Sequence, residues 1–378
     1  MTRAKSTTIS EAAPNRCMPL TEWPDSDRIA WSAAMRPGSP FTSGGIAARW
    51  AAATRTITIN GYGRWPTWLQ RHGFLDPSTP LGTRATEERL IAYVASLRAE
   101  VGDFTVQARI QQLGDALRAM APTGDWGWIL RAATRLRSEA IPVKDKRARL
   151  QMPDRLVELG IRLMAEAGSA PGRSEIQRAV TFRDGLVIAL LAYRPVRIRT
   201  LTAITIGRQL VAHNGGWQMV FGPEDIKTKH SFECSFPREL ASHLDIYLSV
   251  HRPILLTCGG RRPPTSTKAL WVSQNGTAMG KAAITYWIRR NTKEAFGAAL
   301  GPHMFRDAAA TAIAIYDPEN VLIIKVILGH STIQTAEKYY NLAGSLEASR
   351  RHHETIAELR APGREFQYCS NSDSTPEA

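Results

Sequence analysis

The residues best suited to chemistry lie near the carboxyl end of the 378-residue chain, in the order His303, Arg306, Leu328-Gly329-His330-Ser331 and Tyr339. His303 and Arg306 are three residues apart and follow Pro302, so they would share one face at a helix N-terminus, where unpaired N–H groups favour an anion. Gly329 suits a helix end, which would place His330 on the next turn. Each feature alone is common by chance, but phosphate-binding groups followed by a tyrosine indicate phosphoryl transfer to a phenol, the chemistry of breaking and rejoining DNA strands.

The charge of the chain favours a polyanionic partner. Lys and Arg number 48 against 34 Asp and Glu, which gives a formal net charge of +14 and a pI near 10.0. Both halves of the chain carry a basic excess, as expected if both contact a phosphate backbone. Charge taken alone has a second explanation, because an Arg-rich and Ala-rich composition is also typical of a GC-rich genome.

Several protein classes are disfavoured by the composition. Cys17, Cys234, Cys258 and Cys369 are far apart and form no CxxC pair, which disfavours a zinc site or a disulfide framework. The longest apolar run, residues 185–193, is shorter than a membrane span, and no signal segment opens the chain. We therefore expect a soluble cytoplasmic protein without membrane contact.

The amino-terminal part predicts a flexible tail, residues 1–40, followed by a small helical domain, residues 41–141. Its helical patterns cover residues 46–59, 86–99, 104–120 and 126–138. We expect exposed arginines on these helices, with core aromatics between them. The arginines are Arg49, Arg55, Arg64, Arg84, Arg109, Arg131 and Arg135, and the aromatics are Trp50, Tyr62, Trp65 and Trp68.

The remainder predicts a basic linker, residues 142–152, a second domain, residues 153–360, and a polar tail, residues 361–378. In the second domain we expect helices from Asp154 and over residues 183–193, then short strands over residues 203–206, 217–221 and 231–236. Helical patterns return from residue 282 to residue 359. The expected fold class is mainly α with a small antiparallel sheet.

At these positions the chain resembles the tyrosine recombinases of the phage-integrase family. The similarity is strongest over residues 295–345, returns in residues 190–204 and is fainter over residues 45–140. The resemblance implies a helical core-binding domain that contacts DNA, followed by a catalytic recombinase domain.

The resemblance also assigns the site. Val196-Arg197-Ile198-Arg199-Thr200-Leu201 matches the string around the first catalytic arginine and selects Arg197 over Arg194 and Arg199. The family's His-x-x-Arg box falls on His303 and Arg306, its Leu-Gly-His-Ser box includes His330, and its nucleophile falls on Tyr339. The catalytic lysine is Lys227 by the match, with Lys229 as the alternative.

A mechanism without a cofactor follows for such a set. Arg197 and Arg306 would clamp the phosphate, His303 would accept the phenol proton, His330 would hold the phosphate and Lys227 would protonate the leaving oxygen. The resemblance further implies double-stranded DNA as the partner, a homo-tetramer on two recombination sites with at most weak self-association off DNA, and a bacterial, nucleoid-associated integrase of a mobile genetic element.

Two departures from the family pattern are visible. Thr200 replaces the acidic residue usual three positions after the first arginine, which we expect to affect helix support more than chemistry, and Arg194-Pro195 replaces a Thr-Gly turn. Three alternatives stay open: a type IB topoisomerase that relaxes one duplex, a DNA-binding protein of the same fold without turnover, and a basic helical protein in which the spacing is coincidence.

Overall fold

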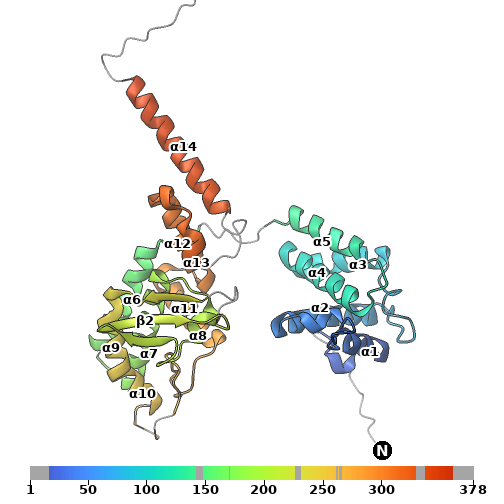
Figure 1. The fold of residues 1–378 in the computed structure, drawn as a ribbon, viewed down its shortest axis with the longest axis horizontal. Coiled ribbons are helices and arrows are strands. Elements are labelled where there is room, and N and C mark those ends of the chain that lie inside the picture. Colours follow the sequence, from blue (N-terminus) through green and yellow to red (C-terminus); the bar gives the residue numbers. More distant parts are fainter. Residues whose placement is uncertain are drawn as a thin grey trace, which may run out of the picture. The chain divides into compact units, whose positions relative to one another are not determined.

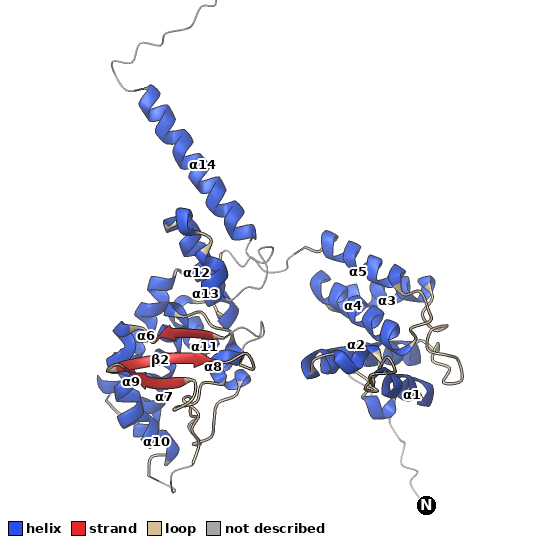
Figure 2. Ribbon diagram, viewed as in Figure 1, coloured by secondary structure: helices blue, strands red, loops and turns tan. Residues whose placement is uncertain are grey.

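The computed structural model describes residues 17–141, 148–169, 171–225, 231–260, 263, 266–328 and 337–360, and it divides into two compact units, Met1–Asp145 and Lys146–Ala378 (Figure 1). Helices dominate both units, and the second also holds a small antiparallel sheet (Figure 2). The predicted fold class is confirmed. Among the described residues, none of the helices combines the length and the apolar character that crossing a bilayer requires.

The first unit is helical throughout its described part. Its α-helices are α1 (Asp25–Ala34), α2 (Ala52–Arg71), α3 (Glu87–Glu100), α4 (Asp103–Met120) and α5 (Gly127–Glu139), and 3₁₀ turns cover Leu20–Glu22 and Ile46–Arg49. Helix α4 is central and packs against α1, α2, α3 and α5. As predicted, Tyr62, Trp65 and Trp68 are buried, and Trp50 packs against the same core.

The prediction of a flexible tail over residues 1–40 is wrong for residues 17–40. Trp23 and Trp31 are buried, and α1 belongs to the core of the first unit. Residues 1–16 lie outside the described residues. The helix is only ten residues long and buries Asp27, a charged residue that breaks the apolar periodicity on which the sequence prediction depended.

The buried Asp27 carboxylate accepts hydrogen bonds from the described side chains of Ser26, Tyr62 and Arg84. The Tyr62 hydroxyl donates to its Oδ2 at 2.7 Å, and the Arg84 guanidinium donates to both carboxylate oxygens, at 3.1 Å to Oδ2. Burial, and then the negative charge of Asp27, raise the pKa of Tyr62 well above its usual value, so the phenol stays a donor. Arg84, predicted to be exposed, is therefore a buried ion-pair residue.

The Asp27→Ala substitution is expected to destabilise the first unit by about 3–5 kcal/mol, because it leaves the Arg84 charge buried without its counter-ion. Chemical denaturation followed by tryptophan fluorescence measures this loss. Asp25→Ala is the matched control, since Asp25 lies on the same helix and pairs with Arg28 at the exposed surface. Equal stability of the two variants would contradict the role assigned to Asp27.

The second helix also differs from the prediction. Residues 46–59 were expected to form one helix, but a 3₁₀ turn ends at Arg49, Trp50 is extended, and α2 begins at Ala52. Helix α2 then continues to Arg71 through Pro66, because its aromatic side chains pack in the core. Tertiary packing here outweighs the local breaker signal.

The second unit combines helices with one sheet. Its α-helices are α6 (Pro153–Ser169), α7 (Glu175–Tyr193), α8 (Ile198–Thr202), α9 (Ala241–Ile246), α10 (Arg252–Leu256), α11 (Lys281–Phe296), α12 (Pro302–Tyr316), α13 (Ile323–Leu328) and α14 (Glu337–Leu359). A π-helical turn, Tyr247–His251, joins α9 to α10, and 3₁₀ turns cover Arg238–Leu240 and Pro318–Asn320.

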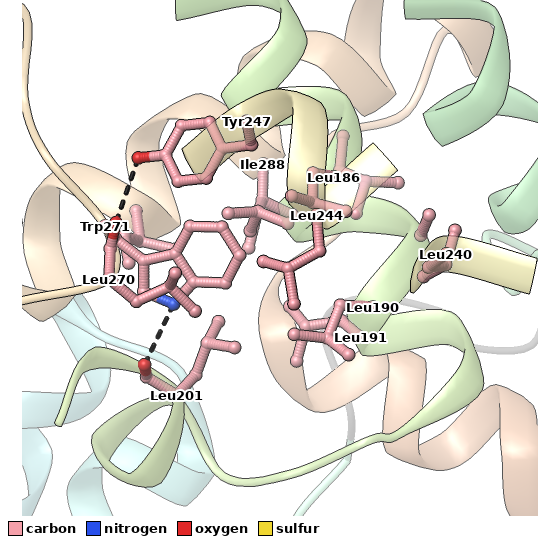
Figure 3. Packing of buried hydrophobic residues seen from close by; sticks show 14 of the residues in the cluster. Leu186, Leu190, Leu191, Leu201, Leu240, Leu244, Tyr247, Leu270, Trp271 and Ile288 are labelled. Atoms are coloured by element: carbon pink, nitrogen blue, oxygen red, sulfur yellow. Dashed lines mark hydrogen bonds between the residues drawn. The ribbon is translucent and has the colours of Figure 1, made fainter. Parts of the chain in front are cut away.

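Helix α7 is the centre of this unit and is buried almost all round. It crosses α6 at two glycines: a Cβ on Gly160 would lie 2.6 Å from the Gly185 carbonyl oxygen, and the reverse distance is the same. Around α7, the Trp271 indole donates to the Leu201 carbonyl at 3.0 Å and the Tyr247 hydroxyl to the Leu270 carbonyl at 2.9 Å (Figure 3). These bonds attach α8 and the chain before α11 to the core.

The sheet has the order β1 (Leu210–His213), β2 (Gly216–Phe221) and β3 (Phe232–Ser235), with antiparallel pairing throughout. The second and third strands lie where they were predicted, but the first predicted strand, residues 203–206, is wrong. The strand begins at Leu210 because Gly207 turns the chain (φ 82°), and β1 then meets β2 through a two-residue Asn214-Gly215 turn with positive φ at both residues. Residues 203–206 contribute only isolated bridges.

Helix α12 contributes to two separate hydrophobic clusters. Phe305 and Ala308 belong to the main core around α7. Ala310 and Ala314 instead pack with Ile324 and Leu328 of α13 in a small cluster of four buried residues. The helix that carries His303 and Arg306 thus joins the main core to α13.

Candidate active site

Helix α12 begins where the sequence predicts, with Gly301 as its N-cap and Pro302 in the first turn. The chain reaches this start from a fixed point, since the buried Thr292 hydroxyl accepts a hydrogen bond from the Leu300 amide at 2.9 Å. Arg149, in the predicted linker, donates to the Ala299 carbonyl. The first turn of α12 is therefore held from two sides.

Arg306 connects three segments that carry or border predicted site residues. Its side chain is only 8% exposed, and its guanidinium donates to the Pro195 carbonyl at 2.6 Å and to the Leu328 carbonyl at 2.5 Å. One guanidinium thus connects α12, the segment that leads to Arg197 and the last residue of α13. Both acceptors are backbone carbonyl oxygens, so neither of these two contacts places a negative charge beside the guanidinium.

Arg197 occupies the N-cap position of α8, two residues after Pro195. The Leu201 amide donates to its carbonyl at 2.9 Å, and Leu201 is fully buried, so the backbone of Arg197 is fixed by the core. Its side chain is half-buried. Arg197 is thus a half-buried residue two positions after Pro195, whose carbonyl accepts from Arg306.

The two neighbouring arginines are placed differently. Arg199 is exposed on α8. Arg194 ends α7 and is close enough to Cys234 of β3 that its charge opposes burial, which raises the pKa of that thiol.

His303 lies in the first turn of α12, and its side chain is exposed. It is one turn before Arg306 on the same helix, so the two side chains project from one face. An exposed imidazole one turn from a buried guanidinium can reach a substrate held by that guanidinium and accept a proton from it.

The other assigned residues lie outside the described side chains. Lys227 and Lys229 fall in residues 226–230 and His330 in residues 329–336, whereas Tyr339 has its backbone in α14 but no described side chain. The structure does fix the residues that border these segments. Asp225 precedes the lysines, and the buried Leu328 precedes the Gly-His-Ser run.

The carbonyl partners of Arg306 are the part of the site that the sequence did not reveal. Any residue type supplies a carbonyl, so no pattern marks Pro195 or Leu328 as a ligand of an arginine. The departure Arg194-Pro195 was the one available signal, because it lies at this contact. Among the described residues no group of three His, Cys, Asp or Glu side chains could hold a metal ion.

Comparisons with known proteins support the fold. No protein-family model and no curated protein matches the chain. The solved XerH site-specific recombinase, in a post-cleavage complex with a palindromic difH substrate, is similar with a TM-score of 0.54 and 14% identity over 92% of this chain and 100% of that chain. A pre-cleavage XerH complex bound to a difH substrate is similar with a TM-score of 0.50 and 13% identity, over 86% of this chain and 96% of that chain. For a lambda integrase dimer bound to a COC′ core site, the TM-score is 0.47 and the identity is 15%, over 86% of this chain and 95% of that chain.

The two XerH similarities extend over both units and pair each with its counterpart in a single solved chain. They agree with the mainly helical architecture and the three-stranded sheet described above. The chain therefore has the fold of the tyrosine recombinases.

Proposed function

We propose that this protein is a site-specific DNA recombinase that cuts and rejoins strands through a 3′-phosphotyrosyl intermediate. The observation that carries the proposal is the Arg306 guanidinium, which joins the helix of His303, the segment of Arg197 and the end of α13 in one place. Through these contacts the helix that carries His303 and the segment that leads to Arg197 meet at one guanidinium, which supports a phosphate clamp at this place. The fold and the basic charge of +14 agree with a DNA substrate.

The chemistry assigned to the site is a transesterification. The Tyr339 oxygen attacks the phosphorus, the bond to the 5′ oxygen breaks, and the phenol proton passes to His303. Arg197 and Arg306 stabilise the extra negative charge on the non-bridging oxygens, with His330 as a further donor. Lys227 delivers a proton to the departing 5′ oxygen. The phosphotyrosyl ester conserves the bond energy, so a second 5′ hydroxyl can attack and reseal the strand.

The proposed partner is double-stranded DNA. Four protomers would hold two recombination sites together, and the biological role would be that of an integrase of a mobile genetic element. Residues 348–359 of α14 are exposed, including the apolar Ile356 and Leu359, which makes a surface available for a neighbouring protomer. The number of chains per duplex can be measured by analytical sedimentation of the protein with duplexes that carry its target sequence, which the capture experiment below identifies. A complex of four chains and two duplexes is expected, and a limit of one chain per duplex would contradict it.

Capture of the covalent intermediate tests the activity and identifies the target sequence in one experiment. The protein is incubated with randomly nicked genomic DNA fragments, in which a cut near a nick releases a short piece and prevents resealing. After denaturation and proteolysis, the DNA ends are sequenced and the attached peptide is identified by mass spectrometry. We expect a 3′-phosphoryl link to the peptide that contains Tyr339. No adduct, a 5′ link or another residue would overturn the proposal.

The recovered sequence then separates recombination from relaxation. Two duplexes of different length that carry this sequence are expected to exchange strands and give joint products. Relaxation of a supercoiled plasmid without joint products would instead indicate a topoisomerase.

A further inference from the structure

Gln209 is a polar side chain buried where no catalytic residue has been assigned. It is 2% exposed and lies between the chain after α8 and the start of β1. Its side-chain oxygen accepts from the Thr205 amide at 3.2 Å, and its side-chain nitrogen donates to both carboxylate oxygens of Asp225, at 3.2 and 3.1 Å. The buried amide therefore connects the end of the α8 segment to Asp225.

Asp225 in turn closes the turn that follows β2. Its Oδ2 accepts from the Gly222 amide at 3.1 Å, and its own amide donates to the Gly222 carbonyl at 3.1 Å. The Arg208 guanidinium is 3.9 Å from Oδ1, but its shorter contact is with the exposed Glu224 at 2.8 Å. The carboxylate is thus held by buried and backbone donors rather than by a surface ion pair.

The Asp225 backbone also contacts α8 directly. The Thr200 hydroxyl, which is buried, donates to the Asp225 carbonyl at 3.5 Å, the long limit of a hydrogen bond. Thr200 is the third residue after Arg197, on a helix of only five residues. A helix this short has little stability of its own, so tertiary contacts decide its orientation.

These contacts hold α8 on two sides. The Trp271 indole fixes the Leu201 carbonyl from the core side (Figure 3). Thr200 and the Gln209–Asp225 pair fix α8 and the chain after it from the sheet side. Arg197 is the N-cap residue of α8, so both sets of contacts determine where its backbone lies.

We propose that Asp225, held by Gln209, is a positioning residue for Arg197. Its carboxylate fixes the turn after β2, and this turn presents the Asp225 carbonyl that accepts from the Thr200 hydroxyl. Asp225 thereby gives α8 the support that an acidic side chain at position 200 would otherwise give. A bidentate arginine clamp depends on sub-ångström placement, and a misplacement of about 1 Å costs about 10²-fold in rate. The inference rests on the proposed function and concerns its phosphate clamp.

A double-mutant cycle with Arg197 tests the assignment. The substrate is a nicked duplex with the sequence recovered from the Tyr339 adducts, and the rate of adduct formation is measured. Asp225→Ala is expected to lower this rate about 10–100-fold in the wild-type background, but less than about threefold in an Arg197→Lys background, because the clamp is already lost there. Equal losses in the two backgrounds, or no loss in either, would overturn the inference.

Two further variants keep the test independent of folding defects. Thr200→Val removes the hydroxyl at nearly constant volume, and we expect a smaller loss that likewise disappears in the Arg197→Lys background. Glu224→Ala is the matched control, because this carboxylate neighbours Asp225 yet is 63% exposed, and its rate is expected to stay unchanged. A rate loss in Glu224→Ala equal to that of Asp225→Ala would also overturn the assignment.

A second substrate gives a readout that a general loss of stability would not move. A methylphosphonate at the cleaved position lacks one negative oxygen, so it depends less on the guanidiniums, and the ratio of wild-type to Asp225→Ala rates is expected to shrink on it. Failure of the wild-type chain to form any adduct on the natural phosphodiester would refute the proposed function itself. Cleavage by the wild type with the same rate in Asp225→Ala would refute only the positioning role.

Discussion

Replacing Tyr339 with phenylalanine is expected to abolish covalent adduct formation, with a fall of at least about 10⁴-fold, while DNA binding is retained. The variant lacks only the oxygen that would attack phosphorus, so the expected loss is that of the nucleophile alone. Adducts on nicked duplex, counted after denaturation, measure the first effect, and mobility shift of the same duplex measures the second.

Tyr340→Phe is the matched control, because it removes the same atom from the next residue of α14. Its adduct yield is expected to equal that of the wild type. Adducts in Tyr339→Phe together with their loss in Tyr340→Phe would move the nucleophile by one residue. Loss in neither variant would refute tyrosine chemistry altogether.

The second large effect is expected at Arg306, where lysine keeps the charge but cannot reproduce two directed bonds. Cleavage should fall about 10²–10³-fold, because the transition state loses a bidentate donor. The protein should also become less stable, since the carbonyls of Pro195 and Leu328 lose their partner and each unsatisfied buried group costs about 1–3 kcal/mol. Single-turnover cleavage and thermal unfolding measure the two effects.

Arg199→Lys provides the control, because Arg199 is exposed on α8 close to Arg197 in sequence. Both its cleavage rate and its melting temperature should remain near wild type. If Arg306→Lys were equally silent, the guanidinium would have neither the structural nor the catalytic role assigned to it.

Elements with strong local signals were predictable from the sequence. The buried helix that became α7, the start of α12 at Pro302 and the turn at Asn214-Gly215 each depend on residue types with narrow conformational preferences. The position of β1 in the sequence was predicted wrongly, because residues 203–206 resemble a strand as closely as residues 210–213 do. Pairing partners, which local patterns do not contain, decide between them.

A long-range polar pair accounts for two further errors. Asp27 and Arg84 are 57 residues apart, and neither looks like a core residue until the other is present. This single pair explains both the missed helix α1 and the arginine wrongly expected at the surface. Gln209 and Asp225 were not predicted for the same reason.

The candidate site was predictable in composition and order, but not in its connections. Spacing and resemblance selected Arg197 and Arg306 from many arginines, and the structure brings their segments together. The backbone carbonyls that make this link carry no signature in the sequence. The catalytic roles of Arg197, Lys227, His303, Arg306, His330 and Tyr339 all stay predictions.

Because α12 packs in two separate clusters, we expect local unfolding of α13 to occur independently of the main core. Among the described residues, Ala310, Ile313 and Ala314 of α12 form a small cluster with Ile324 and Leu328 of α13. Release of α13 from this cluster exposes little apolar surface and should require less free energy than global unfolding. Amide hydrogen exchange should therefore show α13 opening while α7 stays protected. Because the Leu328 carbonyl accepts from Arg306, such a subglobal opening would break the bond between Arg306 and α13 without melting the domain.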